Sequence, residues 1–330
     1  MREEPVNPAP LRLVFLGSDG IALPLLRWLA GEGAAHAVLA GVFTQPDRPS
    51  GRGQHLRPNP IKAWALEKGL PVFQPEKVGA DSVARLSELG AEVALVVAYG
   101  HILRDDFIAA PRFGTWNLHA SVLPGYRGAS PIQTAIACGE TETGMTFMRI
   151  VRELDAGPVA GVERVPIGPL DTASEVEEGL SHASVPLVAR ILPKLARGEL
   201  ACADQDPARA TFCRRLAKED GVLDFNSSAS VLAARINGLF PWPGCTVTMA
   251  GQQVRLGLAD AVQSGPGPAP GTVLGADAEG LRVATGAGML RLRRLQRPGG
   301  RMLPAAEFLR GFPVGAGTLL ASHPMPTLLR

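Results

Sequence analysis

The sequence predicts an α/β protein in which a Rossmann-like domain built on a parallel sheet is followed by a small β-barrel. Apolar strands alternate with helical segments over the first half, and short strands separated by Gly and Pro turns fill the last third. At 330 residues the chain also exceeds the roughly 250–300 residues at which one hydrophobic core usually stops growing. We therefore expect two domains.

Apolar runs and helical periodicity predict the elements of the first domain. The first run, LRLVFLG, passes through a Ser-Asp-Gly turn into the helical pattern IALPLLRWLA. A second helix is expected at residues 81–89 and a long amphipathic one at residues 174–198. The predicted strands lie at residues 11–17, 37–44, 91–100, 116–119 and 145–150. Alternating strands and helices are typical of a parallel sheet covered on both faces.

The polarity and periodicity of the sequence change after Gly198. Residues 199–215 are polar and without periodicity, which indicates a linker, and the segment that follows has one helical stretch at residues 230–237 among short β-like runs. The leader carries Glu3 and Glu4 with three prolines and no apolar core, so it does not resemble a secretory signal. The predicted organisation is a disordered leader at 1–10, a catalytic domain at 11–198, the linker, and a C-terminal domain at 216–330.

Composition excludes several functional classes. With 46% hydrophobic and 19% charged residues and no apolar run near the ~20 residues of a membrane span, the chain is predicted to be globular rather than membrane-spanning or disordered. Its four cysteines have neither metal-ligand spacing nor the density of a disulfide scaffold, which suits a reducing cytoplasm. A net charge of +2 means that any nucleic-acid interface must depend on local basic clusters.

The first turn does not carry a dinucleotide fingerprint. It offers only Gly17 and Gly20 where three glycines are expected, and no acidic residue ends the second strand. The sequence therefore argues against a nicotinamide nucleotide.

A polar cluster follows one predicted strand of the first domain. Asn117 and His119 are two residues apart, so their side chains leave the strand on the same face, and a loop rich in Gly and Pro begins at Ser121. Asp155, on a neighbouring loop, is a candidate to orient the imidazole and support its protonated form. These groups suit acyl transfer without a covalent nucleophile, although a packed structural histidine is the alternative. His119 has no second ligand at metal-binding spacing, so no metal is expected.

The same region resembles a known family. NLHASVLPGYRGASPIQ, ETGMTFM and LDAG resemble the 10-formyltetrahydrofolate-dependent formyltransferases. Within that superfamily, TQPDRPSGRG and LRPNPIK in the first half, with INGLFPWPG and GGRMLPAAEFLRG in the second, are similar to the branch that acts on methionyl-tRNA. The resemblance implies an OB-type barrel at the C-terminus, 10-formyltetrahydrofolate as formyl donor, methionyl initiator tRNA as acceptor, no metal, and a cytoplasmic monomer.

The resemblance also assigns residues. It places catalysis on Asn117, His119 and Asp155, with Asn117 stabilising a tetrahedral oxyanion. The folate-contacting residues that it implies are Ser121, Val122, Leu123, Pro124, Val97, Ala98, Tyr99 and Gly100. Gln54 and His55 depart from the two lysines that are usual in the basic loop, and no role is assigned to His101 or Arg104.

Basic clusters on both predicted domains suggest a phosphate backbone as partner. The loop at 44–62 has four basic residues against one acid. Residues 281–301 contain six arginines and no acid, and the alternation in LRLRRLQR places several of these arginines on one face of a strand. The predicted tRNA-binding residues are Arg48, Arg52, Arg57, Lys62, Lys218, Arg291, Arg293 and Arg294. A solvated surface loop is the plain alternative for the first cluster. A formyltransferase for a small amine, such as a glycinamide nucleotide or an amino sugar, and an inactive RNA-binding protein remain alternative functions.

Overall fold

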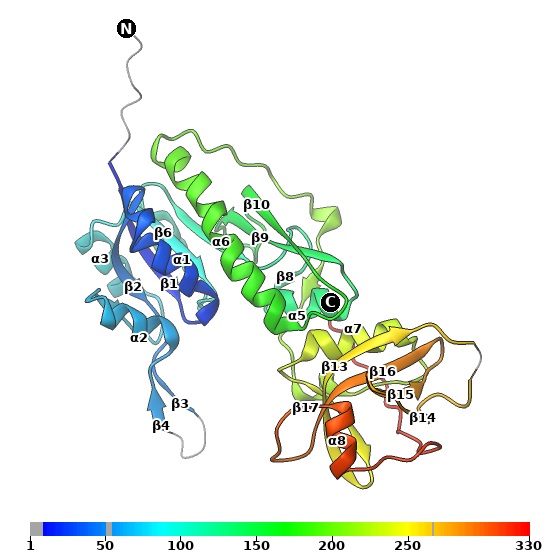
Figure 1. The fold of residues 1–330 in the computed structure, drawn as a ribbon. Helices are drawn as coiled ribbons and strands as arrows, with labels where there is room; N and C mark the ends of the chain where they lie inside the picture. Colours follow the sequence, from blue (N-terminus) through cyan, green and yellow to red (C-terminus); the bar gives the residue numbers. More distant parts are fainter. Residues whose placement is uncertain (1–8, 51–54, 266) are drawn as a thin grey trace. The chain divides into compact units, whose positions relative to one another are not determined.

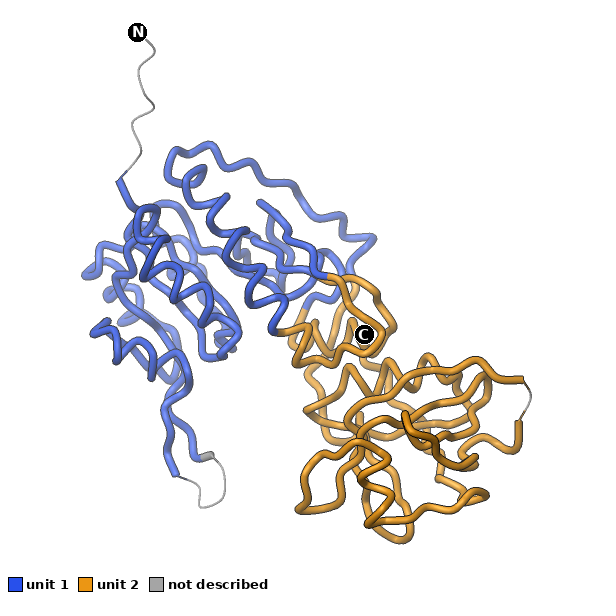
Figure 2. The backbone as a smooth tube through the Cα atoms, viewed as in Figure 1, with its two compact units in different colours: residues 1–127, 144–165, 178–210 blue, residues 128–143, 166–177, 211–330 orange. Residues whose placement is uncertain are grey.

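The computed structural model describes residues 9–50, 55–265 and 267–330. The chain forms two compact units, which Figure 2 distinguishes by colour. The first comprises residues 1–127, 144–165 and 178–210, and the second comprises residues 128–143, 166–177 and 211–330. The chain thus passes between the units several times, and the predicted bounds of the leader, domains and linker stay a prediction.

A seven-stranded sheet forms the centre of the first unit (Figure 1). Its order is β10-β9-β7-β6-β1-β2-β5, and the pairs among β1, β2, β5, β6 and β7 are parallel, whereas β9 pairs with β7 in antiparallel orientation. The strands are β1 (Leu11–Gly17), β2 (Ala37–Phe43), β5 (Val72–Phe73), β6 (Val93–Val97), β7 (Thr115–His119), β9 (Glu142–Arg149) and β10 (Val159–Pro166). Every residue of β6 is buried, and so is every residue of β1 except Arg12, which explains their nearly continuous apolar sequences.

Helices accompany this sheet, and a small hairpin extends from it. The helices are α1 (Leu23–Leu29), α2 (Pro60–Glu67), α3 (Ala80–Glu88), α4 (Asp105–Ala109) and α6 (Ala173–Ala196), with short 3-10 turns η1 (Gly20–Ala22) and η2 (Glu32–Ala35). The hairpin consists of β3 (Arg48–Ser50) and β4 (His55–Arg57), and a two-residue strand, β8 (Arg127–Gly128), follows the loop after β7. Helices α3 and α6 differ from the sequence predictions by at most two residues at either end.

The second unit contains a six-stranded antiparallel sheet around its own hydrophobic core. The order is β12-β13-β16-β15-β14, with β17 paired to β16. Its elements are η3 (Pro207–Arg209) just before it, β11 (Phe212–Cys213), η4 (Lys218–Gly221), α5 (Pro131–Ala137), α7 (Ala229–Leu239), β12 (Cys245–Met249), β13 (Gln252–Val262), β14 (Val273–Ala276), β15 (Leu281–Ala284), β16 (Met289–Gln296), β17 (Leu303–Pro304) and α8 (Ala305–Gly311). The predicted fold class is therefore confirmed: a parallel-sheet α/β domain followed by a small domain built on a curled antiparallel sheet.

The buried carboxylate of Asp220 stabilises the segment that leads into the main part of the second unit. The side chain of Asp220, 2% exposed, accepts hydrogen bonds from the backbone of Ala217 at 2.7 Å and from both terminal nitrogens of Arg214. Arg235 donates to the Asp220 carbonyl at 2.9 Å. Burial raises the pKa of Asp220, but the bonds from Arg214 and Ala217 and the charges of both arginines outweigh it, so the pKa lies below its ordinary value.

The depressed pKa makes stability depend on pH. The folded state holds the Asp220 proton less tightly than the unfolded state, so its stabilisation is complete above the unfolded pKa of about 4 and is lost as the pH falls through the lower folded value. We expect Asp220→Asn to lower the unfolding temperature at neutral pH, and the difference from the parent protein to shrink below about pH 4. Thermal unfolding followed across this pH range measures the difference. A gap that stays constant down to the most acid conditions would contradict the assignment.

Candidate active site

Strand β7 carries two of the predicted catalytic side chains. Asn117 is half-buried and His119 is buried, at 6% exposure, and the alternation of the strand places both on one face. The residues between and before them face the other side, where Trp116 stacks on Phe147 with ring centroids 5.1 Å apart. The sheet therefore fixes the amide and the imidazole on one surface at the carboxyl end of β7.

Both ring nitrogens of His119 have partners. Nε2 lies 2.9 Å from the carbonyl oxygen of Tyr126, and because a carbonyl only accepts, Nε2 carries the proton of this bond. Nδ1 lies 3.7 Å from Oδ2 of Asp155, which is beyond hydrogen-bond length but within an ion-pair contact. The structure thus brings His119 and Asp155 together, with side chains 7% and 14% exposed.

Three residues of this region have left-handed backbone conformations that side chains rarely adopt. They are Ala98 (φ 47°), Tyr126 (φ 58°) and Asp155 (φ 49°). Among the described residues the one other non-glycine case is Ala250, in the turn between β12 and β13. Each such residue costs on the order of 1–3 kcal/mol and is kept where the surroundings fix it, often at functional sites.

The predicted folate segment at Ser121–Pro124 begins directly after β7 and is tied to β9. Thr146 donates from its hydroxyl to the carbonyl of Ser121 at 2.6 Å and accepts from the Leu123 amide at 3.3 Å. Ser121 donates in turn to the carbonyl of Gly125 at 2.6 Å. Ser121 and Leu123 are buried, whereas Val122 and Pro124, which follows a cis peptide bond, are half-buried.

The second predicted folate segment continues from β6, whose last residue is Val97. The Ala98 carbonyl accepts from the amide of Ser18 at 3.3 Å, and the Tyr99 carbonyl accepts from the Gln45 side chain at 3.0 Å. Ala98 and Gly100 are exposed, and Tyr99 is buried. Since Val96 of β6 pairs with Asn117 of β7, the two folate segments leave neighbouring strands at the same edge of the sheet.

Two polar atoms beside this second segment are buried and have no hydrogen-bond partner among the described residues. They are the hydroxyl of Tyr99 and Nε2 of His101, whose rings meet edge to face at 5.0 Å. Burial raises the pKa of the Tyr99 hydroxyl. Burial, helped by the charge of Arg48 and opposed by that of Glu76, lowers the pKa of His101. Buried polar atoms without a protein partner are uncommon, and a ligand with its own donors and acceptors can satisfy them.

The hairpin after β2 holds part of the predicted tRNA-binding set. Arg48 and Arg57 are both exposed and face each other across β3 and β4, with Arg48 donating to the side chain of Gln45 at 3.2 Å. Lys62 instead forms an ion pair with Asp47, at 2.5 Å. The bonds that Lys62 and Gln74 donate hold the pKa of Asp47 below its ordinary value. Arg52 and Gln54 lie outside the described residues.

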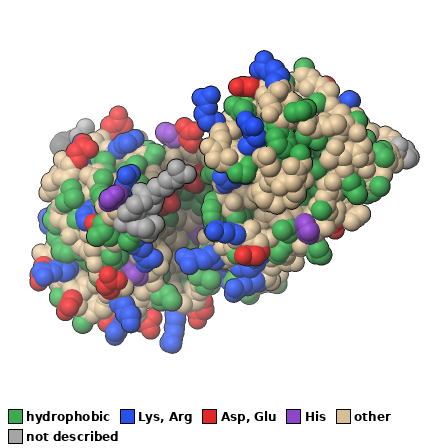
Figure 3. All heavy atoms as spheres, turned by 90° about the horizontal axis from the view of Figure 1, so that it is seen from below, with side chains coloured by type: hydrophobic (Ala, Val, Ile, Leu, Met, Phe, Trp, Pro, Cys, Tyr) green, Lys and Arg blue, Asp and Glu red, His purple; other side chains and the backbone are tan. Residues whose placement is uncertain are grey.

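The second unit holds the remaining predicted basic residues, in two different states. Arg291 and Arg293 lie on β16 opposite β13 and donate to the carboxylate of Asp260, each at a closest distance of 2.6 Å. Arg291 also contacts Glu279. Burial raises the pKa of Asp260, but the two arginines hold it below its ordinary value. Arg294, across a register irregularity from Arg293, and Lys218 are exposed. On the face drawn in Figure 3, basic and acidic side chains are likewise interspersed.

The structure also shows contacts that the sequence did not suggest. Tyr126, Thr146 and Gln205 contact the predicted site residues through backbone and side-chain hydrogen bonds. Tyr126 lies in the recognisable PGYRG loop, which was a signal, but Gln205 lies in the polar linker, where no pattern marked it.

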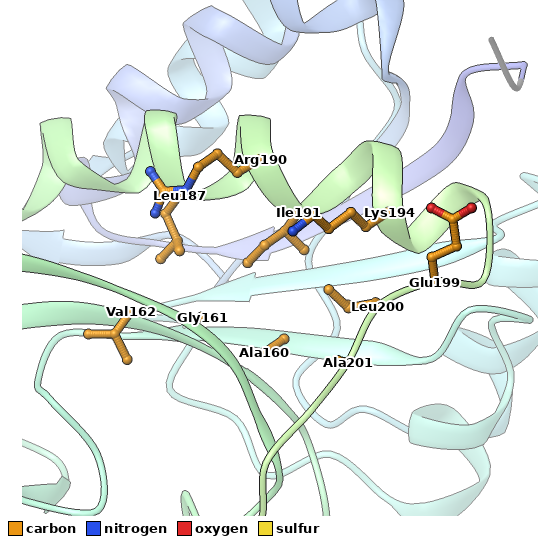
Figure 4. A pocket seen from close by; sticks show the side chains of 10 residues that line it. All are labelled: Ala160, Gly161, Val162, Leu187, Arg190, Ile191, Lys194, Glu199, Leu200 and Ala201. Atoms are coloured by element: carbon orange, nitrogen blue, oxygen red, sulfur yellow. The ribbon is translucent and has the colours of Figure 1, made fainter. Parts of the chain in front are cut away.

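A separate cavity of about 250 Å³ lies between α6, β10 and the segment after the helix (Figure 4). It is lined by Ala160, Gly161, Val162, Leu187, Arg190, Ile191, Lys194, Glu199, Leu200 and Ala201, none of which belongs to the predicted site. Among the residues that the structure covers, no three His, Cys, Asp or Glu side chains form a metal-binding group, and no helix there is long and apolar enough to span a membrane.

Comparisons with known proteins agree over most of the chain. Residues 11–192 match the formyl transferase family model, and residues 215–313 match the model of the formyl transferase C-terminal domain. A methionyl-tRNA formyltransferase from Aromatoleum aromaticum is 41% identical over 94% of this chain and 98% of its own. One from Sorangium cellulosum is 43% identical over 94% of this chain and 99% of its own.

Solved structures share the fold at lower identity. HypX from Aquifex aeolicus in complex with tetrahydrofolic acid is 17% identical with a TM-score of 0.60, covering 93% of this chain, which spans about half (48%) of the HypX chain. WlaRD, a sugar 3N-formyl transferase, is 15% identical with a TM-score of 0.64 and coverages of 87% and 97%. Because both family models match in order and the sequence relatives are similar over nearly their full length, the chain belongs to the formyl transferase family and, within it, to the methionyl-tRNA formyltransferases.

Proposed function

We propose that the protein transfers the formyl group of 10-formyltetrahydrofolate to the α-amine of methionyl initiator tRNA. The observation that carries this proposal is the 41–43% identity to methionyl-tRNA formyltransferases over 94% of the chain, which includes both units. The pairing of His119 with Asp155 beside Asn117 supports it, since these groups have the chemistry that the transfer needs.

In the proposed mechanism the amine nitrogen attacks the formyl carbon and a tetrahedral oxyanion forms. A C–N bond to the amine is made, the bond from the formyl carbon to N10 breaks, and the proton lost by the amine balances the one gained at N10. Asn117 donates a hydrogen bond to the oxyanion, and a preorganised donor of this kind is worth roughly 3–4 kcal/mol. The N–H at Nε2 of His119 donates a second hydrogen bond to the oxyanion, in place of its bond to the Tyr126 carbonyl. Asp155 contacts Nδ1 on the opposite side of the ring.

The residues present fit the folate donor. The segments at Val97–Gly100 and Ser121–Pro124 follow adjacent strands, where open α/β sheets bind ligands. At the Val97–Gly100 segment, the Tyr99 hydroxyl and Nε2 of His101 are buried and have no hydrogen-bond partner among the described residues, and a pteridine ring offers both donors and acceptors.

The exposed basic residues are the proposed contacts to tRNA phosphates. Arg48 and Arg57 belong to the hairpin, Arg294 and Lys218 belong to the second unit, and Arg52, outside the described residues, is proposed from the sequence alone. Lys62, Arg291 and Arg293 are already paired with carboxylates, so we expect them to contribute less. A reducing cytoplasm, where the tRNA substrate is found, and a monomeric state complete the proposal.

A direct assay tests the function. Incubation of the protein with 10-formyltetrahydrofolate and methionyl initiator tRNA should yield formylmethionine on the tRNA, whereas glycinamide nucleotides and amino sugars should stay unmodified. Transfer to a small amine with none to tRNA would favour the alternative enzyme class. Binding of tRNA without any transfer would indicate an inactive RNA-binding protein.

We predict that His119→Ala abolishes most turnover while folate binding persists. The imidazole contacts the reacting atoms in the proposal, whereas other residues make the proposed folate contacts, so kcat should fall by roughly 100-fold or more with the folate Kd little changed. Single-turnover kinetics and folate titration measure the two effects. Near-normal turnover would remove His119 from the mechanism.

We predict that Arg57→Ala raises the KM for methionyl-tRNA far more than the KM for the folate, because this exposed side chain is a proposed phosphate contact. The variant should also lower the slope of log KM for tRNA against log salt concentration by about one unit. Arg52→Ala should act in the same direction. Equal effects on both substrates would sink the assignment of the hairpin to tRNA.

A further inference from the structure

The side chain of Gln205 lies on the connector after α6 and makes four hydrogen bonds within the first unit. Its Nε2 donates to the carbonyls of Asp155 and Gly157, both at 2.8 Å. Its Oε1 accepts from Nε and Nη2 of Arg127, at 3.1 and 2.8 Å. A carboxamide has two N–H donors and two acceptor lone pairs, so its capacity is fully used. Since guanidinium only donates and carbonyls only accept, the orientation of the amide is also fixed.

Backbone pairing puts Gln205 in this place. Ala203 and Val159 exchange two backbone hydrogen bonds, of 2.8 and 2.9 Å, as an antiparallel bridge. Because the two segments run antiparallel, residue 205, two positions after Ala203, lies opposite residue 157, two positions before Val159. The connector therefore lies along the start of β10, a few residues after Ala201 of the cavity in Figure 4. Its Gln205 side chain reaches the loop that carries Asp155.

The two segments that Gln205 joins are the ones that hold His119. Asp155 contacts Nδ1 of the ring, and Tyr126, adjacent to the buried Arg127, accepts from Nε2. Both Asp155 and Tyr126 are in left-handed conformations, which unconstrained loops leave readily. Gly157 adds a tight contact, because a Cβ there would lie 1.8 Å from the Arg149 carbonyl. The Asp155 loop is thus held by close packing against Arg149 and by the hydrogen bonds from Gln205.

We propose that Gln205 is a positioning residue for the His119–Asp155 pair: its carboxamide ties the Asp155 loop to Arg127 and so fixes both partners of the imidazole. It touches neither substrate nor the reacting atoms. This inference rests on the proposed formyl transfer for its kinetic consequence, but the position of the ring is measurable without any reaction.

Two substitutions separate the contacts. Gln205→Met keeps the length of the side chain and removes all four hydrogen bonds. Gln205→Glu keeps the acceptors for Arg127 but turns a carboxylate oxygen toward the carbonyls of Asp155 and Gly157. Asp204→Asn changes the exposed neighbour on the same connector and serves as the matched control.

Both Gln205 variants should lower kcat by about 10–100-fold, with the KM values for folate and tRNA within about twofold of the parent, because supporting hydrogen bonds act on geometry rather than on binding. Asp204→Asn should leave kcat unchanged. In an Asp155→Asn background, Gln205→Met should cost less than about threefold, because the pair through which it acts is already broken. Additive losses in that background, or an unchanged kcat in both single variants, would overturn the proposal.

A spectroscopic measurement tests the positioning independently of activity. In protein with isotope-labelled histidine, the imidazole N–H resonance that disappears in His119→Ala reports the bond to the Tyr126 carbonyl. We expect this resonance to broaden or exchange rapidly in both Gln205 variants and to persist in Asp204→Asn. Persistence in both Gln205 variants would refute the role, and Gln205→Glu, which keeps its bond to Arg127, guards against loss of folding. If the parent protein transfers no formyl group, the proposed function fails while this resonance still decides the role of Gln205.

Discussion

The site depends on one imidazole held at both nitrogens. Strand β7 fixes where the His119 ring starts, and two loops bring the Tyr126 carbonyl to one side and the Asp155 carboxylate to the other. Each loop meets the ring at a residue in a left-handed conformation, which is costly for an L residue. The position of the ring therefore depends on the packing and hydrogen bonds that keep those two loops in their conformations.

Close pairing of the central parallel strands determines which loops lie next to each other. A Cβ on Gly17 would lie 2.5 Å from the Val97 carbonyl, so this glycine is required for the close approach of β1 and β6. The carboxyl ends of β6 and β7 then lie side by side, because Val96 pairs with Asn117. The topology thus brings together two loops that are distant in sequence, at the sheet edge where open α/β sheets bind ligands.

Regular periodicity made much of this predictable. The parallel strands, the helix at α6 and the shared face of Asn117 and His119 follow from local patterns that the structure reproduces. The loop contacts do not follow from such patterns, since a left-handed Asp155 is set by tertiary packing and not by its neighbours in the sequence. Gln205 was hidden for the same reason: a polar segment without periodicity looks like a linker, yet one backbone bridge gives it a defined register.

A count of charges along the chain does not show which arginines are paired with carboxylates. The arginine-rich strand β16 contains no acid, but Asp260 on the antiparallel neighbour β13 accepts hydrogen bonds from both Arg291 and Arg293. A paired carboxylate offsets part of the arginine charge, so the contribution of these two arginines to binding a polyanion is reduced. What matters for a tRNA backbone is therefore the set of unneutralised charges. That set is fixed by strand register, which a count of basic residues in a sequence window does not contain.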